Sequence, residues 1–224
     1  METPVYDFIT KYIKADKARL HMPGHKGVAS LGPEAFDITE VSGADSLYEA
    51  DGIISVSEKN ATELFGSGRT VYSTEGSTQC VKAMLFLASL QSGAKRPLFV
   101  AARNVHKSFV FGAAFLDARI RWIYPEKQEG ICSCTVTPER LEKTLASLKE
   151  TPAGVYVTSP DYLGNMCDIR GLADVCARFG TLLLVDNAHG SYLHFLKKPL
   201  HPMDLGADIC RDSAHKTLPV LTGG

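Results

Sequence analysis

The chain has 224 residues, of which 45% are hydrophobic and 22% charged, and its formal net charge is −1. This length and composition suffice for the core of one α/β domain. The near-neutral, mixed charge gives no basic face for nucleic acid, and no apolar run has the length of a membrane span. We therefore expect neither a nucleic acid nor a membrane as a partner. The amphipathic N-terminus is unlike a signal peptide and predicts a cytoplasmic protein with a small-molecule ligand.

Apolar, β-branched runs alternate along the chain with segments of helical period, which favours a mostly parallel sheet with helices on both faces. The predicted helices cover 79–90, 107–116, 138–149 and 171–179. Thr137 is the expected N-cap of the third, with Pro138 at its first position. The predicted strands cover 70–73, 98–101, 120–124, 154–158, 181–186 and 207–210. A further strand is expected to begin over 218–221, where we expect the chain to be truncated.

Six cysteines are present without a C-x-x-C pair, and we expect reduced thiols. Cys132 and Cys134 could supply half of a zinc site, but no second pair stands nearby and tetrahedral zinc needs four ligands. We therefore predict no metal.

The segment Thr74-Glu75-Gly76-Ser77-Thr78 follows a predicted strand and opens a helix. Backbone N–H groups and hydroxyls at a helix N-terminus can bind a phosphate, although Gly-Ser-Thr is also an ordinary helix cap. His106 begins another helix, where it is either a cap or a flat ring that could stack on a flat cofactor.

Asp186 ends the apolar run Leu182–Val185, at the strand edge where open α/β sheets bind ligands. It is either a turn residue or the counter-ion of a protonated ring nitrogen. Lys216 follows thirty positions later, beside Ser213 and His215. A loop lysine is usually a solvated charge, whereas a desolvated lysine amine is a good Schiff-base nucleophile and its two neighbours suit a phosphate.

Six motifs make the chain resemble, nearly end to end, the Orn/Lys/Arg decarboxylase family of fold-type-I enzymes that use pyridoxal 5'-phosphate (PLP). They are His21-Met-Pro-Gly-His-Lys-Gly27, Asp37-Ile-Thr-Glu40 with Gly43-Ala-Asp-Ser-Leu47, Asn104-Val-His-Lys-Ser108, Thr158-Ser-Pro-Asp-Tyr162 with Gly164, Asp186-Asn-Ala-His-Gly190 and Ser213-Ala-His-Lys216.

The resemblance implies decarboxylation of arginine, lysine or ornithine through a Schiff base of PLP on Lys216. Asp186 would pair with the ring nitrogen, and His106 would stack on the ring. Ala188 and His189 would line the opposite face or the ring hydroxyl. The phosphate would be bound by Gly76, Ser77, Thr78, Ser213 and His215. The cradle sequence departs from the Asn-Gly-Thr-Ser type that is commoner in the family.

The resemblance also implies a homodimer or higher homo-oligomer. Residues 1–35 would form an N-terminal helix and active-site arm, and residues 36–224 a PLP-binding large domain without the family's small C-terminal domain. Two alternatives stay open: another PLP reaction, such as that of an aminotransferase or lyase, and a truncated chain that binds PLP without catalysis.

Overall fold

The computed structural model describes residues 2–125 and 132–220. The chain divides into two compact units, Met1–Tyr72 and Ser73–Gly224. The predicted boundary after residue 35 separates an active-site arm from a PLP-binding domain. The two compact units do not test these roles, so the boundary stays a prediction. In the described residues, no helix is long and apolar enough to cross a bilayer.

The first unit contains two α-helices, α1 (Pro4–Lys14) and α2 (Ile53–Leu64), and one 3-10 turn, η1 (Pro33–Phe36). Helix α1 packs on α2. The predicted strand over 70–73 is wrong, because its donors are used locally: the Thr70 N–H donates to Thr62 Oγ1 and the Tyr72 N–H to Glu58 Oε1. With these N–H groups bonded to side chains of α2, residues 70–72 are not assigned to a sheet.

The second unit is built on a parallel sheet of five described strands in the order β2-β1-β3-β4-β5. These strands are β1 (Leu98–Ala102), β2 (Arg119–Ile123), β3 (Gly154–Thr158), β4 (Leu182–Asn187) and β5 (Ile209–Asp212). The predicted α/β class and parallel sheet are confirmed. Because all strands point the same way, residues that follow β1, β3, β4 and β5 meet at one edge of the sheet.

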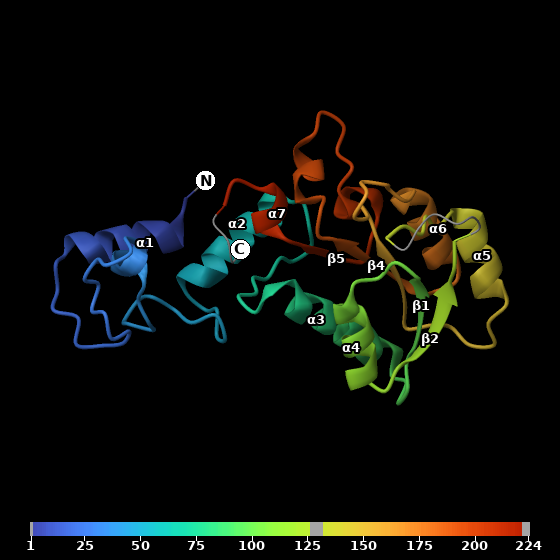
Figure 1. The fold of residues 1–224 in the computed structure, drawn as a ribbon, viewed down its shortest axis with the longest axis horizontal. Helices are drawn as coiled ribbons and strands as arrows, with labels where there is room; N and C mark the ends of the chain where they lie inside the picture. The colour runs from blue at the N-terminus through green and yellow to red at the C-terminus, as the bar shows by residue number, and fades with distance from the viewer. Residues whose placement is uncertain (1, 126–131, 221–224) are drawn as a thin grey trace. The chain divides into compact units, whose positions relative to one another are not determined.

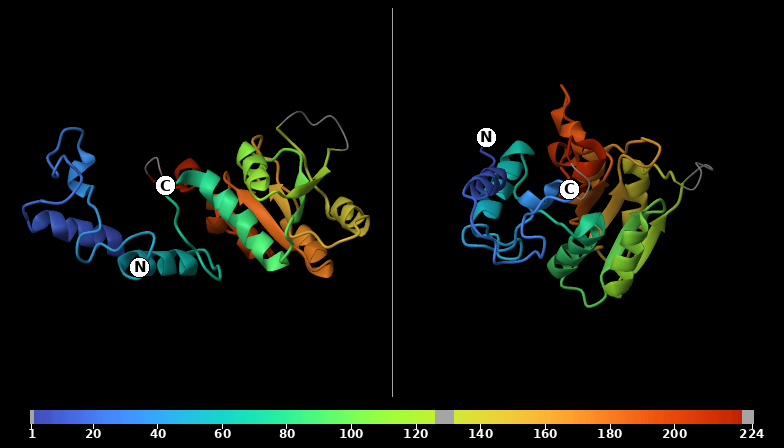
Figure 2. Two further views of the ribbon diagram at one scale, coloured as in Figure 1. Left: turned by 90° about the horizontal axis from the view of Figure 1, so that it is seen from below. Right: turned by 60° about the vertical axis from the view of Figure 1, so that its left-hand side comes forward.

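Helices cover both faces of this sheet (Figure 1, Figure 2), as predicted. They are α3 (Gly76–Ser92), α4 (Lys107–Phe115), α5 (Pro138–Ala146) and α6 (Ile169–Arg178). The chain moves from β1 outward to β2 through α4, then back across β3 to β4 through α5 and α6. Right-handed crossovers in opposite directions place their helices on opposite faces, so α4 lies on one side of the sheet and α5 and α6 on the other. Helix α3 packs against α4 on the first side.

Alternating strand residues separate the core into two layers. Phe99, Tyr156 and Leu184 point to α3 and α4, whereas Val100, Val155 and Leu183 point to α5 and α6. This alternation explains why β3 is buried along its whole length. Thr137 accepts a hydrogen bond from the Arg140 N–H and is the N-cap of α5, as predicted.

The remaining elements are η2 (Ser191–Phe195), η3 (Pro202–Leu205) and the single turn α7 (Ala214–Thr217). Strand β5 begins two residues later than predicted, because Gly206 (φ +98°) ends η3 in the left-handed region and the chain must turn before it can pair. Residues 218–220 of the predicted last strand are not a strand, and Leu221 lies outside the described residues.

Candidate active site

The carboxyl ends of β3, β4 and β5 bring a buried polar cluster together. In the sheet register, Asp186 of β4 is directly opposite Arg211 of β5 and Thr158 of β3. Register partners in a parallel pair have side chains on the same face, and Tyr156 is two residues before Thr158 on that face. Asp186, Arg211 and Tyr156 therefore share the face that is covered by α3 and α4.

Asp186 is almost fully buried and bonded at both of its carboxylate oxygens. Its Oδ1 lies 2.6 Å from Nη2 of Arg211 and accepts a hydrogen bond from the Ala188 N–H at 3.2 Å. Its Oδ2 accepts a hydrogen bond of 2.9 Å from the Tyr156 hydroxyl. Burial and the nearby Asp186 charge raise the pKa of Tyr156 well above its ordinary value, so this phenol remains a donor.

The predicted phosphate cradle lies inside the first turn of α3. This helix begins at Gly76 (φ +69°), three residues earlier than predicted, and its N-cap, Glu75, makes no capping hydrogen bond. The Ser77 and Ser213 hydroxyl oxygens, 136 positions apart in sequence, lie 2.5 Å from each other. Backbone donors of α3 and hydroxyls from two elements thus converge at a positive helix end, an arrangement that suits an anion.

His106 is the N-cap of α4, which was one of its two predicted interpretations. Its Nδ1 accepts a hydrogen bond from the Ser108 N–H and lies 2.5 Å from Ser108 Oγ, and Ser108 Oγ is 3.2 Å from Thr78 Oγ1. Desolvation first, with repulsion from Arg211 and nearby lysines, lowers the pKa of His106 despite the attraction of Asp186. The ring is therefore held neutral beside the cradle, and its predicted stacking role stays a prediction.

Lys216 lies on α7 with an exposed side chain. Its Nζ is 3.4 Å from Nε2 of His189, and Nδ1 of His189 is 3.3 Å from the Pro160 carbonyl. The carbonyl can only accept, so it selects the tautomer in which Nδ1 carries the proton and Nε2 can accept from the lysine. Partial desolvation, and then repulsion from Arg211, lower the pKa of Lys216, whereas Asp186 raises it.

Polar contacts of residues in β5 and directly after it hold the turn that carries Lys216. Asp212 Oδ1 accepts a hydrogen bond of 2.6 Å from Asn187, and Asp212 Oδ2 lies 3.1 Å from Nε2 of the buried His201. Ser213 is buried, and Arg211 Nη1 donates to its hydroxyl at 3.0 Å. Of the other predicted cofactor residues, Ala188 is buried after β4, and His215 is exposed on α7.

His201, Cys210 and Asp212 form the one trio of metal-ligating groups in the described part of the chain, with their ligand atoms within 4.8 Å of each other. However, His201 Nδ1 accepts a hydrogen bond from the Met203 N–H, so the proton resides on Nε2, directed at Asp212. In that tautomer Nε2 has no lone pair for a metal. The trio is explained as a hydrogen-bonded pair with a neighbouring thiol.

Three side chains of this cluster were missed from the sequence: Arg211, Tyr156 and Ser108. Arg211 was missed because the strand was predicted to stop at Cys210, which left its register with Asp186 out of view. An arginine directly after the predicted strand and two residues before Ser213 was the available signal, since a charge that becomes buried there needs a partner. Tyr156 looked like an ordinary core residue, and Ser108 stood inside a quoted motif without a role.

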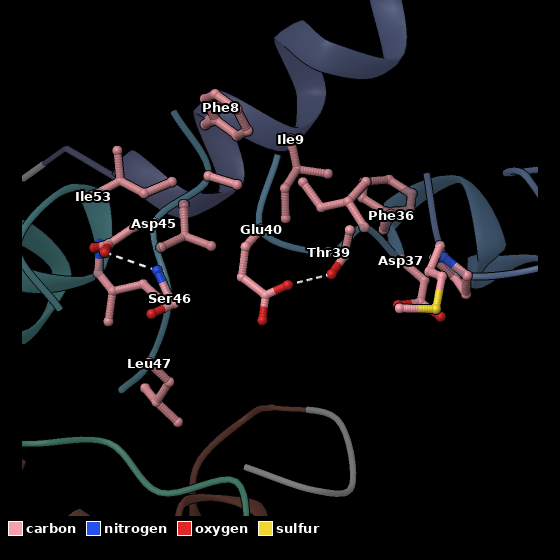
Figure 3. Close-up of a pocket in the computed structure, with 16 residues that line it drawn as sticks. Phe8, Ile9, Phe36, Asp37, Thr39, Glu40, Asp45, Ser46, Leu47 and Ile53 are labelled. Atoms are coloured by element: carbon pink, nitrogen blue, oxygen red, sulfur yellow. Dashed lines mark hydrogen bonds between the residues drawn. The ribbon is translucent and has the colours of Figure 1, made fainter. Parts of the chain in front are cut away.

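A cavity of about 480 Å³ lies within the first unit (Figure 3). Apolar side chains of α1 and of the following segments line it, among them Phe8, Ile9 and Phe36. Asp45 and Glu40 also reach it, and Asp45 accepts a hydrogen bond of 2.8 Å from the Ser46 N–H. None of the predicted cofactor residues lines this cavity, so we do not assign the chemistry to it.

Comparison with known proteins agrees with this geometry. Residues 3–224 match the model of the family described as "Orn/Lys/Arg decarboxylase, major domain". The chain belongs to this family. It is 32% identical over 234 residues to the arginine decarboxylase of Bacillus subtilis (strain 168) and 30% identical over 234 residues to that of Halalkalibacterium halodurans. In both cases 99% of this chain aligns with 46% of the relative, so the chain spans just under half the length of these decarboxylases.

A solved structure of similar fold is the constitutive lysine decarboxylase of E. coli. Its TM-score is 0.73 at 19% identity, with 99% of this chain and 35% of that chain covered. The likeness supports the fold-type-I architecture that the sequence predicted.

Proposed function

We propose that this chain provides the PLP-binding region of a decarboxylase that acts on a basic amino acid, with arginine as the first substrate to test. The observation that carries the proposal is the convergence of Asp186, the Ser77 and Ser213 hydroxyls and Lys216 at one sheet edge. These residues come from β4, α3, the end of β5 and α7, and they supply the three kinds of group that PLP requires.

The hydrogen-bonding positions that the cluster leaves unused fit the cofactor. A carboxylate offers about four acceptor positions. Ala188, Arg211 and Tyr156 use three of them on Asp186, which leaves one position on Oδ2 for a ring N–H. Thr158 Oγ1 and Arg211 Nε are buried on the same face without a hydrogen-bond partner among the described residues. Buried atoms of this kind indicate a missing polar group, and a cofactor would supply one.

Each residue then has a defined task. Lys216, whose pKa is lowered by desolvation, would hold the cofactor's aldehyde carbon covalently, and His189 would orient its amine. The first turn of α3 with Ser77 and Ser213 would bind the phosphate, and neutral His106 would cover one ring face. When bound, the cofactor supplies an electron sink for the pair that is released as carbon dioxide leaves. Asp186 would hold the proton on the ring nitrogen.

Arginine is placed first because the two relatives compared above are named arginine decarboxylases. Lysine and ornithine remain to be tested beside it. We also propose a homo-oligomer, as the family resemblance implies.

The test is covalent trapping followed by product analysis. The chain is incubated with PLP and reduced with borohydride, and the label is mapped by mass spectrometry. We expect the label on Lys216 and its loss in Lys216→Ala, whereas the exposed-lysine control Lys198→Ala retains it. Carbon dioxide and amine are then measured with arginine, lysine and ornithine. A label on another lysine contradicts the cofactor assignment, and a keto acid product in place of carbon dioxide supports the aminotransferase alternative.

A further inference from the structure

Arg211 stands in the middle of the proposed cofactor site, although no motif pointed to it. Its side chain is 5% exposed. One terminal nitrogen lies 2.6 Å from Asp186 Oδ1, and the other donates to Ser213 Oγ at 3.0 Å. The guanidinium therefore joins the carboxylate proposed for the ring nitrogen to a hydroxyl proposed for the phosphate.

A buried charge without a counter-charge is strongly destabilising. Without a cofactor, Asp186 would be such a charge if Arg211 were absent. Lys216 does not take this role, because its side chain is exposed and its amine contacts His189. His106 is held neutral by desolvation. Arg211 is thus the cation in direct contact with Asp186 among the described residues.

The contact also leaves room for a second partner. Arg211 and the Ala188 N–H occupy Oδ1, whereas among the described residues Oδ2 accepts from the Tyr156 hydroxyl alone and retains one acceptor position. The Arg211 pair does not need to break when a ring N–H arrives. Instead, the carboxylate can be shared between a resident cation and an incoming one.

We propose that Arg211 is the resident counter-ion of Asp186: it neutralises and orients this carboxylate in the cofactor-free protein, and then shares it with the ring nitrogen of PLP. Arg211 is a positioning residue in this scheme, since it acts through Asp186. The cofactor half of the inference rests on the proposed function, whereas the cofactor-free half does not.

The first experiment measures the urea midpoint of unfolding without PLP. Arg211→Met lowers it because Asp186 is left buried and uncompensated, and the double variant Asp186→Asn with Arg211→Met recovers most of the loss. Arg211→Lys, which keeps the charge, falls between Arg211→Met and the parent. Arg178→Met, at an exposed pair with Glu142, is the matched control and lowers the midpoint far less than Arg211→Met. If Arg211→Met does not fold but the double variant does, the inference is supported. If both fail equally, Arg211 acts by packing and the inference is overturned.

The second experiment compares the affinities of PLP and 1-deaza-PLP, which has C–H in place of the ring nitrogen. Both carry the same phosphate, so the ratio of their dissociation constants isolates the ring-nitrogen contact. In the parent, replacing the ring N–H by C–H leaves the Asp186 carboxylate paired with Arg211. In Arg211→Met, the same replacement removes the last cation that contacts Asp186. We expect the ratio to rise about tenfold in Arg211→Met, the lower end for close buried charge pairs, and to fall back in the double variant. An unchanged ratio overturns the sharing.

The two proposals fail in different ways. If the parent chain takes up no PLP, the proposed function fails, and the cofactor-free comparison alone decides the role of Arg211. If the parent binds PLP at Lys216 and Arg211→Met changes neither the midpoint nor the ratio, the proposed function stands and the counter-ion role is wrong.

Discussion

The two units of the chain are stabilised in different ways. The second has a two-layer apolar core around a parallel sheet. In the first unit, among residues 2–72, Glu58 is the one buried residue. There the backbone is organised by carboxylates: Glu34 accepts from the N–H groups of residues 30–32, and Asp45 from those of residues 46, 51, 52 and 54.

This difference predicts which perturbations should lower the stability of each unit. Burial of apolar surface is the main source of folding free energy, and the first unit has little of it. Asp45 accepts from the N–H of Ile54 in the first turn of α2 and from that of Gly52, the N-cap, which has no side chain of its own to cap the helix. We therefore expect the second unit to depend on packing and the first on the ionisation of a few carboxylates.

The largest effect is expected for Phe109→Ala in the second unit. Phe109 is fully buried, and its ring centroid lies 4.5 Å from that of Tyr156 and 6.0 Å from that of Trp122. Truncation of a buried phenylalanine costs about 3 to 5 kcal/mol of unfolding free energy. Trp122 is the one tryptophan of the sequence, so the urea midpoint of its fluorescence reports on this unit.

Phe8→Ala in the first unit is the matched control. Phe8 is half-buried beside the cavity and stacks on Tyr12 with a centroid distance of 6.3 Å. We expect the Trp122 midpoint to stay unchanged in this variant. If Phe8→Ala lowers it as much as Phe109→Ala, the two units do not unfold independently and the contrast between them is lost.

A smaller effect is expected for Tyr156→Phe, which keeps the packing of the second unit but removes a donor from Asp186. Hydrogen bonds to charged groups contribute about 1.5 to 3 kcal/mol, and the cost of Tyr156→Phe should lie in that range. Urea unfolding of the cofactor-free chain measures it. Tyr162→Phe, at an exposed ring, serves as the control. A loss as large as that of Phe109→Ala would contradict the assignment of the hydroxyl as a single hydrogen bond.

Much of the second unit was predictable, because its strands are apolar runs between turn residues. The strand over 154–158 matches β3 residue for residue, and Asp186 was placed correctly at a strand end. The ion pair with Arg211 was not predictable in the same way, since it depends on register between β4 and β5, and a two-residue error in β5 hides it. In the first unit, the predicted strand over 70–73 failed because side chains of α2 bind its N–H groups, a tertiary contact that leaves no period in the sequence.

The pH dependence of the first unit sharpens the contrast. Backbone N–H groups, that of Leu31 first, lower the pKa of Glu34 from 4.5 to about 2. The folded pKa is depressed, so the contribution of Glu34 is fully present above the unfolded pKa and is lost as the pH falls from about 4.5 through about 2. We expect the protection factors of the amides at residues 30–32, which compare each exchange rate with the intrinsic rate at the same pH, to fall in this window, measured by NMR. Glu34→Gln should exchange faster at neutral pH and lose this dependence, and an unaltered profile would show that Glu34 does not hold the turn.

The smallest effect is expected at exposed ion pairs on the helices of the second unit. Arg178 Nη2 lies 2.9 Å from Glu142 Oε1, with about half of each side chain exposed. Such pairs contribute at most about 1 kcal/mol, because water screens the attraction and two long side chains lose freedom. A double-mutant cycle of Arg178→Met and Glu142→Gln, followed by urea unfolding at low and high salt, should give a coupling near zero at high salt.

The same cycle at Arg211 and Asp186 should retain its coupling in salt, since a buried pair is screened far less. Equal salt sensitivity in the two cycles would mean that water reaches the Asp186 carboxylate and that the cluster at the end of β4 is open.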